Sequence, residues 1–175
     1  MSETNDSIGK IALSWWKKLV ASDGAKRAAR AKLRRCSTPN EALAIHETLD
    51  LYHQLKAAHG WVKDKSERVA IIAVVLAQVK DNSPEPFAKA LGRKTFGDKD
   101  SAVLSEARFR RLLQADDDEL MEQFRRAIRL LKNEANVESI ALTILNWGDG
   151  TRKRFIFDYY HVFADAPAVP AEATP

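Results

Sequence analysis

Apolar residues recur along nearly the whole chain with the period of an α-helix. The first such segment places a stripe of apolar residues on a single face: Ile8, Ile11, Ala12, Trp15 and Leu19. No stretch alternates apolar and polar residues convincingly, as a half-buried strand would. The sequence therefore predicts an all-α fold, a bundle of about eight or nine helices. With 175 residues, the chain is long enough to bury a core without disulfides.

Residues that begin helices mark several of these segments. Thr38, Pro39 and Glu41 form a capping box, in which the threonine is the N-cap and the glutamate side chain reaches back. The helix that they begin is expected to continue past Tyr52. Further N-caps are predicted within the run Asp116, Asp117 and Asp118, and at Asn136 and Thr151.

A glycine-rich and charged stretch, residues 92–99, is expected to be an exposed loop that divides the chain into two lobes. The predicted lobes are residues 1–92 and 93–164, and the Pro/Ala-rich residues 165–175 are predicted to form a disordered tail. The longest apolar run, residues 69–79, is too short to span a membrane and is expected to be buried on most sides. The absence of a secretory signal and the single cysteine favour a cytoplasmic protein.

Positive charge is concentrated near the N-terminus. Residues 10–35 contain nine Lys and Arg residues against one carboxylate, Asp23, and so carry a net charge of +8. The whole chain carries only +4, so the remainder carries −4. Charge concentrated in this way attracts polyanions far more strongly than the net figure suggests.

The predicted second helix carries the densest group of cations. Lys26, Arg30 and Arg34 follow one another at four-residue intervals, with Arg27 beside the row and Arg35 at its end. Successive members of such a row stand about 6 Å apart along a helix, close to the phosphate repeat of a nucleic-acid strand. A solvated helix face is the alternative interpretation. Because acidic partners are nearly missing, and like charges destabilise a helix, we favour phosphate binding.

Three further basic groups extend this hypothesis along the chain. They are Arg93 and Lys94 in the predicted loop, Arg108, Arg110 and Arg111 on the next helix, and Arg152, Lys153 and Arg154 after the Gly148–Gly150 turn. Arg125, Arg126 and Arg129 are weaker candidates, because nearby carboxylates such as Glu122 could pair with them. No aromatic residue alternates with the cations, and the four tryptophans are expected to lie in the core.

No constellation of residues predicts catalysis, a metal site or a cofactor. His46 and His53 are seven residues apart, without a third ligand nearby in the sequence. Cys36 follows two arginines, which could lower the pKa of its thiol, but no base accompanies it. Phosphate-binding and dinucleotide-binding glycine motifs are absent. The acidic run 116–118 is interpreted as a helix cap.

Several segments together resemble a known family. RFRRLLQADDDELMEQFRRAIRLL (108–131) and NWGDGTRKRFIFDYY (146–160) are similar to the CasB small subunit of the type I-E CRISPR Cascade complex, as are SWWKKL (14–19) and FAKALGR (87–93). The order and spacing of these segments match over about residues 8–163.

The resemblance implies a two-lobed helical subunit that steadies an R-loop without reading sequence. Its implied partners are other Cascade subunits, a second copy of itself lying head to tail, crRNA, and the target and displaced DNA strands; no membrane or small-molecule substrate is implied. The basic positions that match the family's are Arg34, Arg35, Arg93, Arg108, Arg125, Arg126 and the group 152–154. Two alternatives stay open: a helical scaffold that docks acidic protein partners, and an enzyme that uses Cys36 or the histidines.

Overall fold

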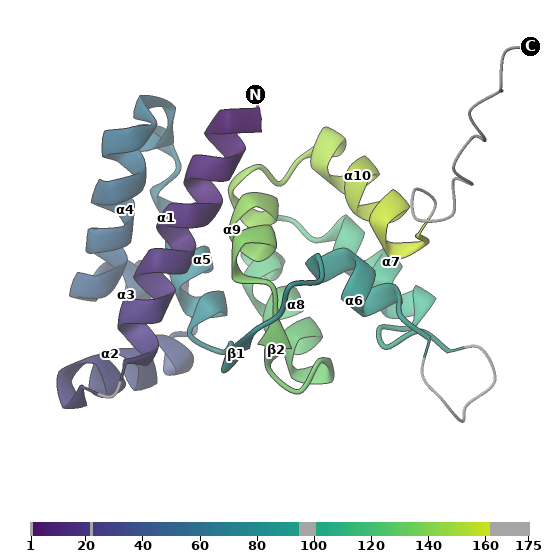
Figure 1. The fold of residues 1–175 in the computed structure, drawn as a ribbon, viewed down its shortest axis with the longest axis horizontal. Helices are drawn as coiled ribbons and strands as arrows, with labels where there is room; N and C mark the ends of the chain where they lie inside the picture. Colours follow the sequence, from purple (N-terminus) through teal and green to yellow (C-terminus); the bar gives the residue numbers. More distant parts are fainter. Residues whose placement is uncertain (1, 22, 95–100, 162–175) are drawn as a thin grey trace, which may run out of the picture.

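The computed structural model describes residues 2–21, 23–94 and 101–161, and these residues form an all-α fold (Figure 1). Within them are ten α-helices, a 3-10 helix and two very short strands, slightly more helices than the eight or nine predicted. In chain order the elements are α1 (Ser2–Val20), α2 (Gly24–Arg35), α3 (Pro39–Leu43), α4 (His46–Ala58), the 3-10 helix η1 (Gly60–Asp64), α5 (Ser66–Leu76), β1 (Asp81–Asn82), α6 (Phe87–Gly92), α7 (Glu106–Gln114), α8 (Asp117–Leu130), β2 (Glu134–Ala135), α9 (Val137–Leu145) and α10 (Asp149–Tyr159).

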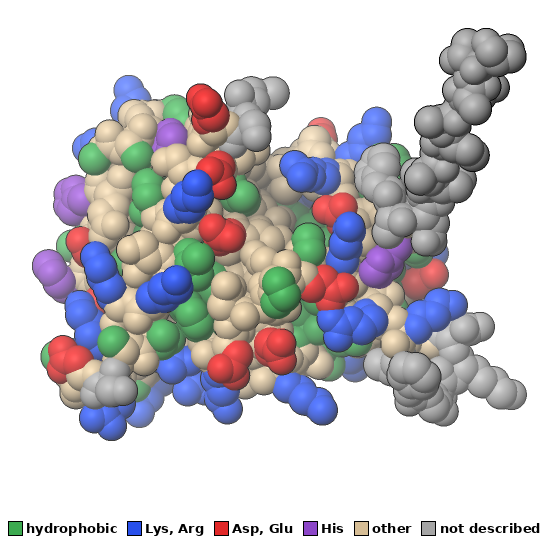
Figure 2. All heavy atoms as spheres, viewed as in Figure 1, with side chains coloured by type: hydrophobic (Ala, Val, Ile, Leu, Met, Phe, Trp, Pro, Cys, Tyr) green, Lys and Arg blue, Asp and Glu red, His purple; other side chains and the backbone are tan. Residues whose placement is uncertain are grey.

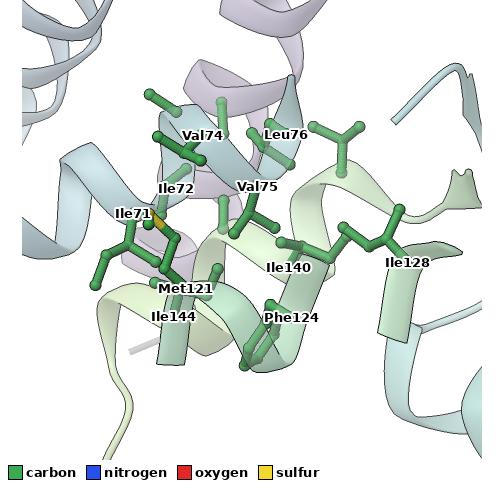
Figure 3. Packing of buried hydrophobic residues seen from close by; sticks show 14 of the residues in the cluster. Ile71, Ile72, Val74, Val75, Leu76, Met121, Phe124, Ile128, Ile140 and Ile144 are labelled. Atoms are coloured by element: carbon green, nitrogen blue, oxygen red, sulfur yellow. The ribbon is translucent and has the colours of Figure 1, made fainter. Parts of the chain in front are cut away.

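Helix α5 lies at the centre of the molecule. Every residue from Val69 to Leu76 is buried, as the near-continuous apolar run predicts. The helix packs against α3 and α4 on one side and against α8 and α9 on the other. Figure 3 shows Ile71 of α5 close to Met121 of α8 and Ile144 of α9, and Val75 of α5 close to Ile140 of α9. Each such side chain contributes about 1.5–3 kcal/mol when fully buried.

The two predicted lobes share this core. Helix α1 packs along α9, and a Cβ atom at Gly9 would stand 3.0 Å from the Cβ of Glu138, so the two helices approach closely. Helix α6, from the predicted first lobe, packs against α10 from the second (Figure 1). The division at residues 92–93 stays a prediction. Arg93 and Lys94 are exposed, whereas residues 95–99 of the expected loop and the predicted tail 165–175 lie outside the described residues.

Three predicted N-caps are confirmed. The Thr38 hydroxyl accepts a hydrogen bond from the Glu41 amide at 3.3 Å, and the Glu41 carboxylate accepts one from the Ser37 amide at 2.7 Å. The side chain of Asp116 accepts from the Glu119 amide at 3.0 Å, and that of Asn136 from the Ser139 amide at 2.8 Å. Because a cap involves residues close in sequence, its residue types identify it reliably.

Two local predictions are wrong. The helix expected from Thr38 to Tyr52 is divided into α3 and α4, because the chain leaves helical geometry at Ile45, whose ψ is 128°. Thr151 is not an N-cap, since α10 begins earlier, at Asp149, with Gly148 before it. The Thr151 hydroxyl instead donates to the carbonyl of Asn146 at 2.6 Å.

The only strand pair named among the described residues joins two loops. β1 and β2 run parallel, with Asp81 opposite Glu134 and Asn82 opposite Ala135. Strands of two residues are too short to show the alternation by which a strand is predicted. In the described part of the chain, no helix has the length and apolar character that crossing a membrane requires.

The tryptophans are not all in the core. Trp15, Trp16 and Trp147 are buried, as predicted, but Trp61 is 41% exposed, and that prediction is wrong. Trp61 lies in η1, beyond the end of α4, and its ring is 5.3 Å from the Lys65 ammonium group. An apolar sequence neighbourhood does not report which way a side chain in a short 3-10 turn points.

Tyr159 ties the end of α10 to the loop before α7, and its environment predicts a pH effect. The residue is 3% exposed, and its hydroxyl donates to the Leu104 carbonyl at 2.6 Å. Burial, followed by the charges of Tyr160 and Glu106, raises the pKa of Tyr159 to about 12. The folded state therefore favours the neutral phenol. The stabilisation from this preference is fully present below the pKa of an unfolded tyrosine, about 10, and is lost as the pH rises towards the folded pKa of about 12.

We expect the Tyr159→Phe variant to be about 1 kcal/mol less stable than the parent protein at neutral pH, because it lacks the hydrogen bond to Leu104. Between pH 10 and 12, the further decrease in the free energy of unfolding should be smaller in the variant than in the parent protein. Urea unfolding of both proteins at several pH values measures this difference. Parallel decreases over that range would contradict the assigned role of Tyr159.

Candidate nucleic-acid interface

Four arginines line a groove between α7 and α8. Arg108 and Arg111 come from α7, and Arg126 and Arg129 from α8. The remaining lining residues are Leu104, Gln123, Ala127 and Leu130, and the groove has a volume of about 390 Å³. The arginines of each pair are three residues apart, so they lie on the same face of their helix.

The opposite faces of these helices hold the groove in place. Phe109 and Leu112 of α7 are buried, and so are Phe124 and Ile128 of α8. The ring of Phe109 stacks on that of Tyr159 with centroids 3.7 Å apart. Both helices are therefore strongly amphipathic, and their arginines are directed to solvent by the burial of the apolar residues beside them.

Local carboxylates do not neutralise the groove. Glu122 is its nearest counter-charge, with contacts of 3.9 Å to Arg125, 3.0 Å to Arg126 and 3.9 Å to Arg129. The predicted intrahelical pairing is thus present, but one carboxylate offsets only one of three guanidinium groups. Arg108 and Arg111 are exposed and form no ion pair with any described residue. The groove keeps an excess of positive charge.

Arg125 differs from the other predicted cations because its guanidinium group is used within the fold. Its side chain is 12% exposed. One nitrogen donates to the Cys36 carbonyl at 2.9 Å and another to the Arg34 carbonyl. These carbonyls belong to the C-terminal end of α2, where a cation interacts favourably with the helix dipole. Arg125 therefore joins α8 to the end of α2 and brings Arg34 beside the helix that carries Arg126.

We expect Arg125→Ala to destabilise the fold by about 2 kcal/mol, because two carbonyl groups lose a charged donor. Arg126→Ala, an exposed change on the same helix, should cost less than about 0.5 kcal/mol. Chemical denaturation of the two variants tests this difference. Equal costs would show that the contacts of Arg125 with α2 do not stabilise the protein.

The predicted row on α2 is divided between the interior and the surface. Arg30 is half-buried and donates to the carbonyls of Ala77 at 3.0 Å and Val79 at 2.7 Å. Burial, and then the charge of Arg34, lowers the pKa of Arg30. Lys26 forms an ion pair with Glu47 at 3.3 Å. The row of cations at four-residue intervals is therefore not a continuous solvent-facing stripe.

The exposed arginines of α2, apart from Arg34, lie outside that row. Arg27, Arg34 and Arg35 are exposed and have no ion pair with described residues. Arg27 and Arg34 are seven residues apart, which places them on one face and about 10 Å apart along the helix. Figure 2 shows Lys and Arg side chains gathered along the lower edge of the molecule, beneath α2. We call Arg27, Arg34 and Arg35, together with Arg108, Arg111, Arg126 and Arg129 of the groove, the cationic surface.

The remaining predicted site residues lie outside the cationic surface as defined. Arg93 pairs with Glu85, and Lys94 forms an isolated bridge with Ala102. Arg152 donates to the Ala115 carbonyl at 3.1 Å and lies 5.4 Å from the centre of the Trp147 ring. Lys153 and Arg154 are exposed, and Arg154 lines a separate groove with Lys89 and Asp158. The 152–154 group is thus partly structural.

The residues considered for catalysis are not brought together. His46 and His53 are exposed on α4, and the described residues contain no group of three His, Cys, Asp or Glu side chains placed to hold a metal ion. Cys36 is buried, and its thiol donates to the Lys32 carbonyl at 3.4 Å. Burial, and then Glu41, raises the pKa of this thiol despite the opposing charge of Arg125. The shift is opposite to the one that neighbouring arginines suggest.

The fold and the cationic surface define a class of protein: an all-helical protein that presents unpaired arginines on packed helices. Residues 29–160 match the family described as CRISPR-associated protein Cse2, and the chain belongs to this family. Membership implies that the chain is a subunit of a Cascade complex.

Solved structures agree with this family. CasB from Thermus thermophilus is 25% identical, with a TM-score of 0.69 over 89% of this chain and 99% of that chain. A CRISPR-associated protein of the Cse2 family, also from Thermus thermophilus, is 26% identical, with a TM-score of 0.68 over the same shares. No curated protein sequence matches the chain.

Proposed function

We propose that this subunit is non-catalytic and binds the sugar–phosphate backbone of target and displaced DNA through the cationic surface, so that it stabilises an R-loop. The observation that carries the proposal is the arginine groove between α7 and α8, whose positive charge exceeds its local counter-charge. The junction made by Arg125 places the exposed end of α2 beside α8. Phosphate contacts can therefore extend beyond a single helix.

Such a surface acts by neutralising phosphates and releasing the counterions that surround them. It requires no base recognition, because guide-to-target pairing supplies sequence choice in an RNA-guided complex. Exchange of a DNA duplex for a heteroduplex and a free strand is nearly balanced in free energy. A few added phosphate contacts can then decide whether the R-loop persists. The crRNA, other Cascade subunits and a second copy of this chain are the proposed partners.

The test is Arg34→Ala, which removes one exposed cation without touching the core. We expect its affinity for random-sequence DNA to fall by about tenfold, and the salt dependence of binding to become shallower by about one charge. Lys63→Ala, an exposed change in η1, is the matched control and should leave both quantities unchanged. Fluorescence anisotropy over a range of salt concentrations measures them.

An unchanged salt dependence in Arg34→Ala would contradict phosphate contact at this position. If DNA and heparin neither bind the protein nor compete with a protein partner for it, the cationic surface would be a docking surface for an acidic protein. That outcome would replace the proposed function.

A further inference from the structure

Leu130 is an exposed leucine among the groove arginines. Leu130 is 38% exposed and lines the groove together with Arg108, Arg111, Arg126 and Arg129. Leu104 and Ala127, which are almost fully buried, complete the apolar floor of the same groove. Phosphate binding needs only the guanidinium groups and gains nothing from exposed apolar surface. The apolar part of the groove offers a contact that phosphate binding alone does not use.

An unpaired nucleotide has the chemistry that fits both the arginines and the apolar floor of the groove. Its phosphate is attracted by the arginines, and its base has a flat apolar face that packs on aliphatic side chains or on guanidinium planes. The volume of about 390 Å³ falls within the range of pockets that hold small ligands. Paired bases in a duplex present no free face, so among nucleic acids an unpaired strand is the one that can fill the apolar floor of the groove.

We propose that the groove between α7 and α8 holds an unpaired base of a single DNA strand against Leu130, while the surrounding arginines bind the adjoining phosphates. The inference rests on the proposed function, because the arginines must first bring the strand to the groove. Contact with a base face is tolerant of sequence, since every base has such a face. The side chain of Gln123 also lines the groove, but the inference does not depend on it.

The test compares a random-sequence single-stranded DNA with an abasic strand that has the same length and phosphates but no bases. Leu130→Ser should weaken binding of the base-containing strand by about fivefold, and leave the abasic strand and the salt dependence unchanged. Leu130→Phe should retain or increase the preference for bases. Leu49→Ser is the matched control, because Leu49 on α4 is equally exposed at 39%, and it should change neither probe.

Arg111→Ala separates the two proposals. It should weaken both strands equally and reduce the salt dependence. If Arg111→Ala has this effect but Leu130→Ser changes neither strand, the base site is overturned and the phosphate surface stands. If Arg111→Ala has no effect on either strand, both proposals fail. A Leu130 effect seen with an RNA strand or a Glu/Leu-rich peptide, but not with DNA, would also overturn the inference.

Discussion

Replacing Arg108 and Arg111 together by glutamate is expected to reduce affinity for DNA by about 100-fold. Each guanidinium contact with a phosphate contributes about 1.5 kcal/mol, so two lost contacts cost about 3 kcal/mol. The introduced carboxylates add repulsion to a groove in which Arg126 already pairs with Glu122. Both residues are exposed on α7 and their side chains make no ion pair with described residues, so the fold should be unaffected.

A charge-matched control distinguishes the loss of the groove contacts from the change in the protein's net charge. Arg110→Glu with Lys63→Glu changes the total charge by the same amount, but Arg110 is on α7 outside the groove lining, 3.5 Å from Glu106, and Lys63 is in η1. The control should lose less than about tenfold in affinity. Gel shifts at fixed salt measure both variants. Equal losses would mean that general attraction, rather than the groove, binds DNA.

Gly92→Ala is expected to destabilise the fold by about 3 kcal/mol. A Cβ atom at Gly92, the last residue of α6, would stand 1.9 Å from the carbonyl oxygen of Tyr159 and 2.8 Å from its carbonyl carbon. These are backbone atoms, so no side-chain rotation relieves the overlap, and α6 must move away from α10. The movement would disturb the hydrogen bond between Tyr159 and Leu104.

The control for this change is Gly150→Ala in the first turn of α10. A Cβ atom there meets nothing within 4 Å, so the substitution should be neutral or stabilising by about 0.5–1 kcal/mol. Urea denaturation of both variants gives the comparison. If the two substitutions had the same effect, the close approach of α6 to α10 would not exist in solution.

The fold was predictable from sequence wherever short-range chemistry decides it. The caps at Thr38, Asp116 and Asn136 depend on residues within three positions, and the burial of α5 follows from its unbroken apolar run. The division between α3 and α4 was not predictable, because apolar periodicity continues through Ile45. Long-range packing, rather than local propensity, fixes such breaks.

The site was predictable only in part, because a sequence shows how many cations a helix has and not what they contact. Arg108 and Arg111 were identified and lie exposed in the groove. Arg30 is predicted to bind phosphate and Arg125 is a weaker candidate, yet each donates to carbonyls at least 47 residues away in the chain. Arg129 is a weaker candidate because of its neighbouring carboxylates, but Glu122 is shared between three arginines and Arg129 lines the groove. No local signal separates these cases.

In the proposed function, the cationic surface binds nucleic acid through its phosphates, irrespective of sequence. The most direct measurement is the affinity of the unmodified protein for two unrelated single-stranded DNA sequences across a series of potassium chloride concentrations. We expect the logarithm of the affinity to fall linearly with the logarithm of salt, with the same slope for both sequences and about 0.7 per phosphate contacted. Affinity that does not change with salt, or a slope that differs between the sequences, would contradict the claim.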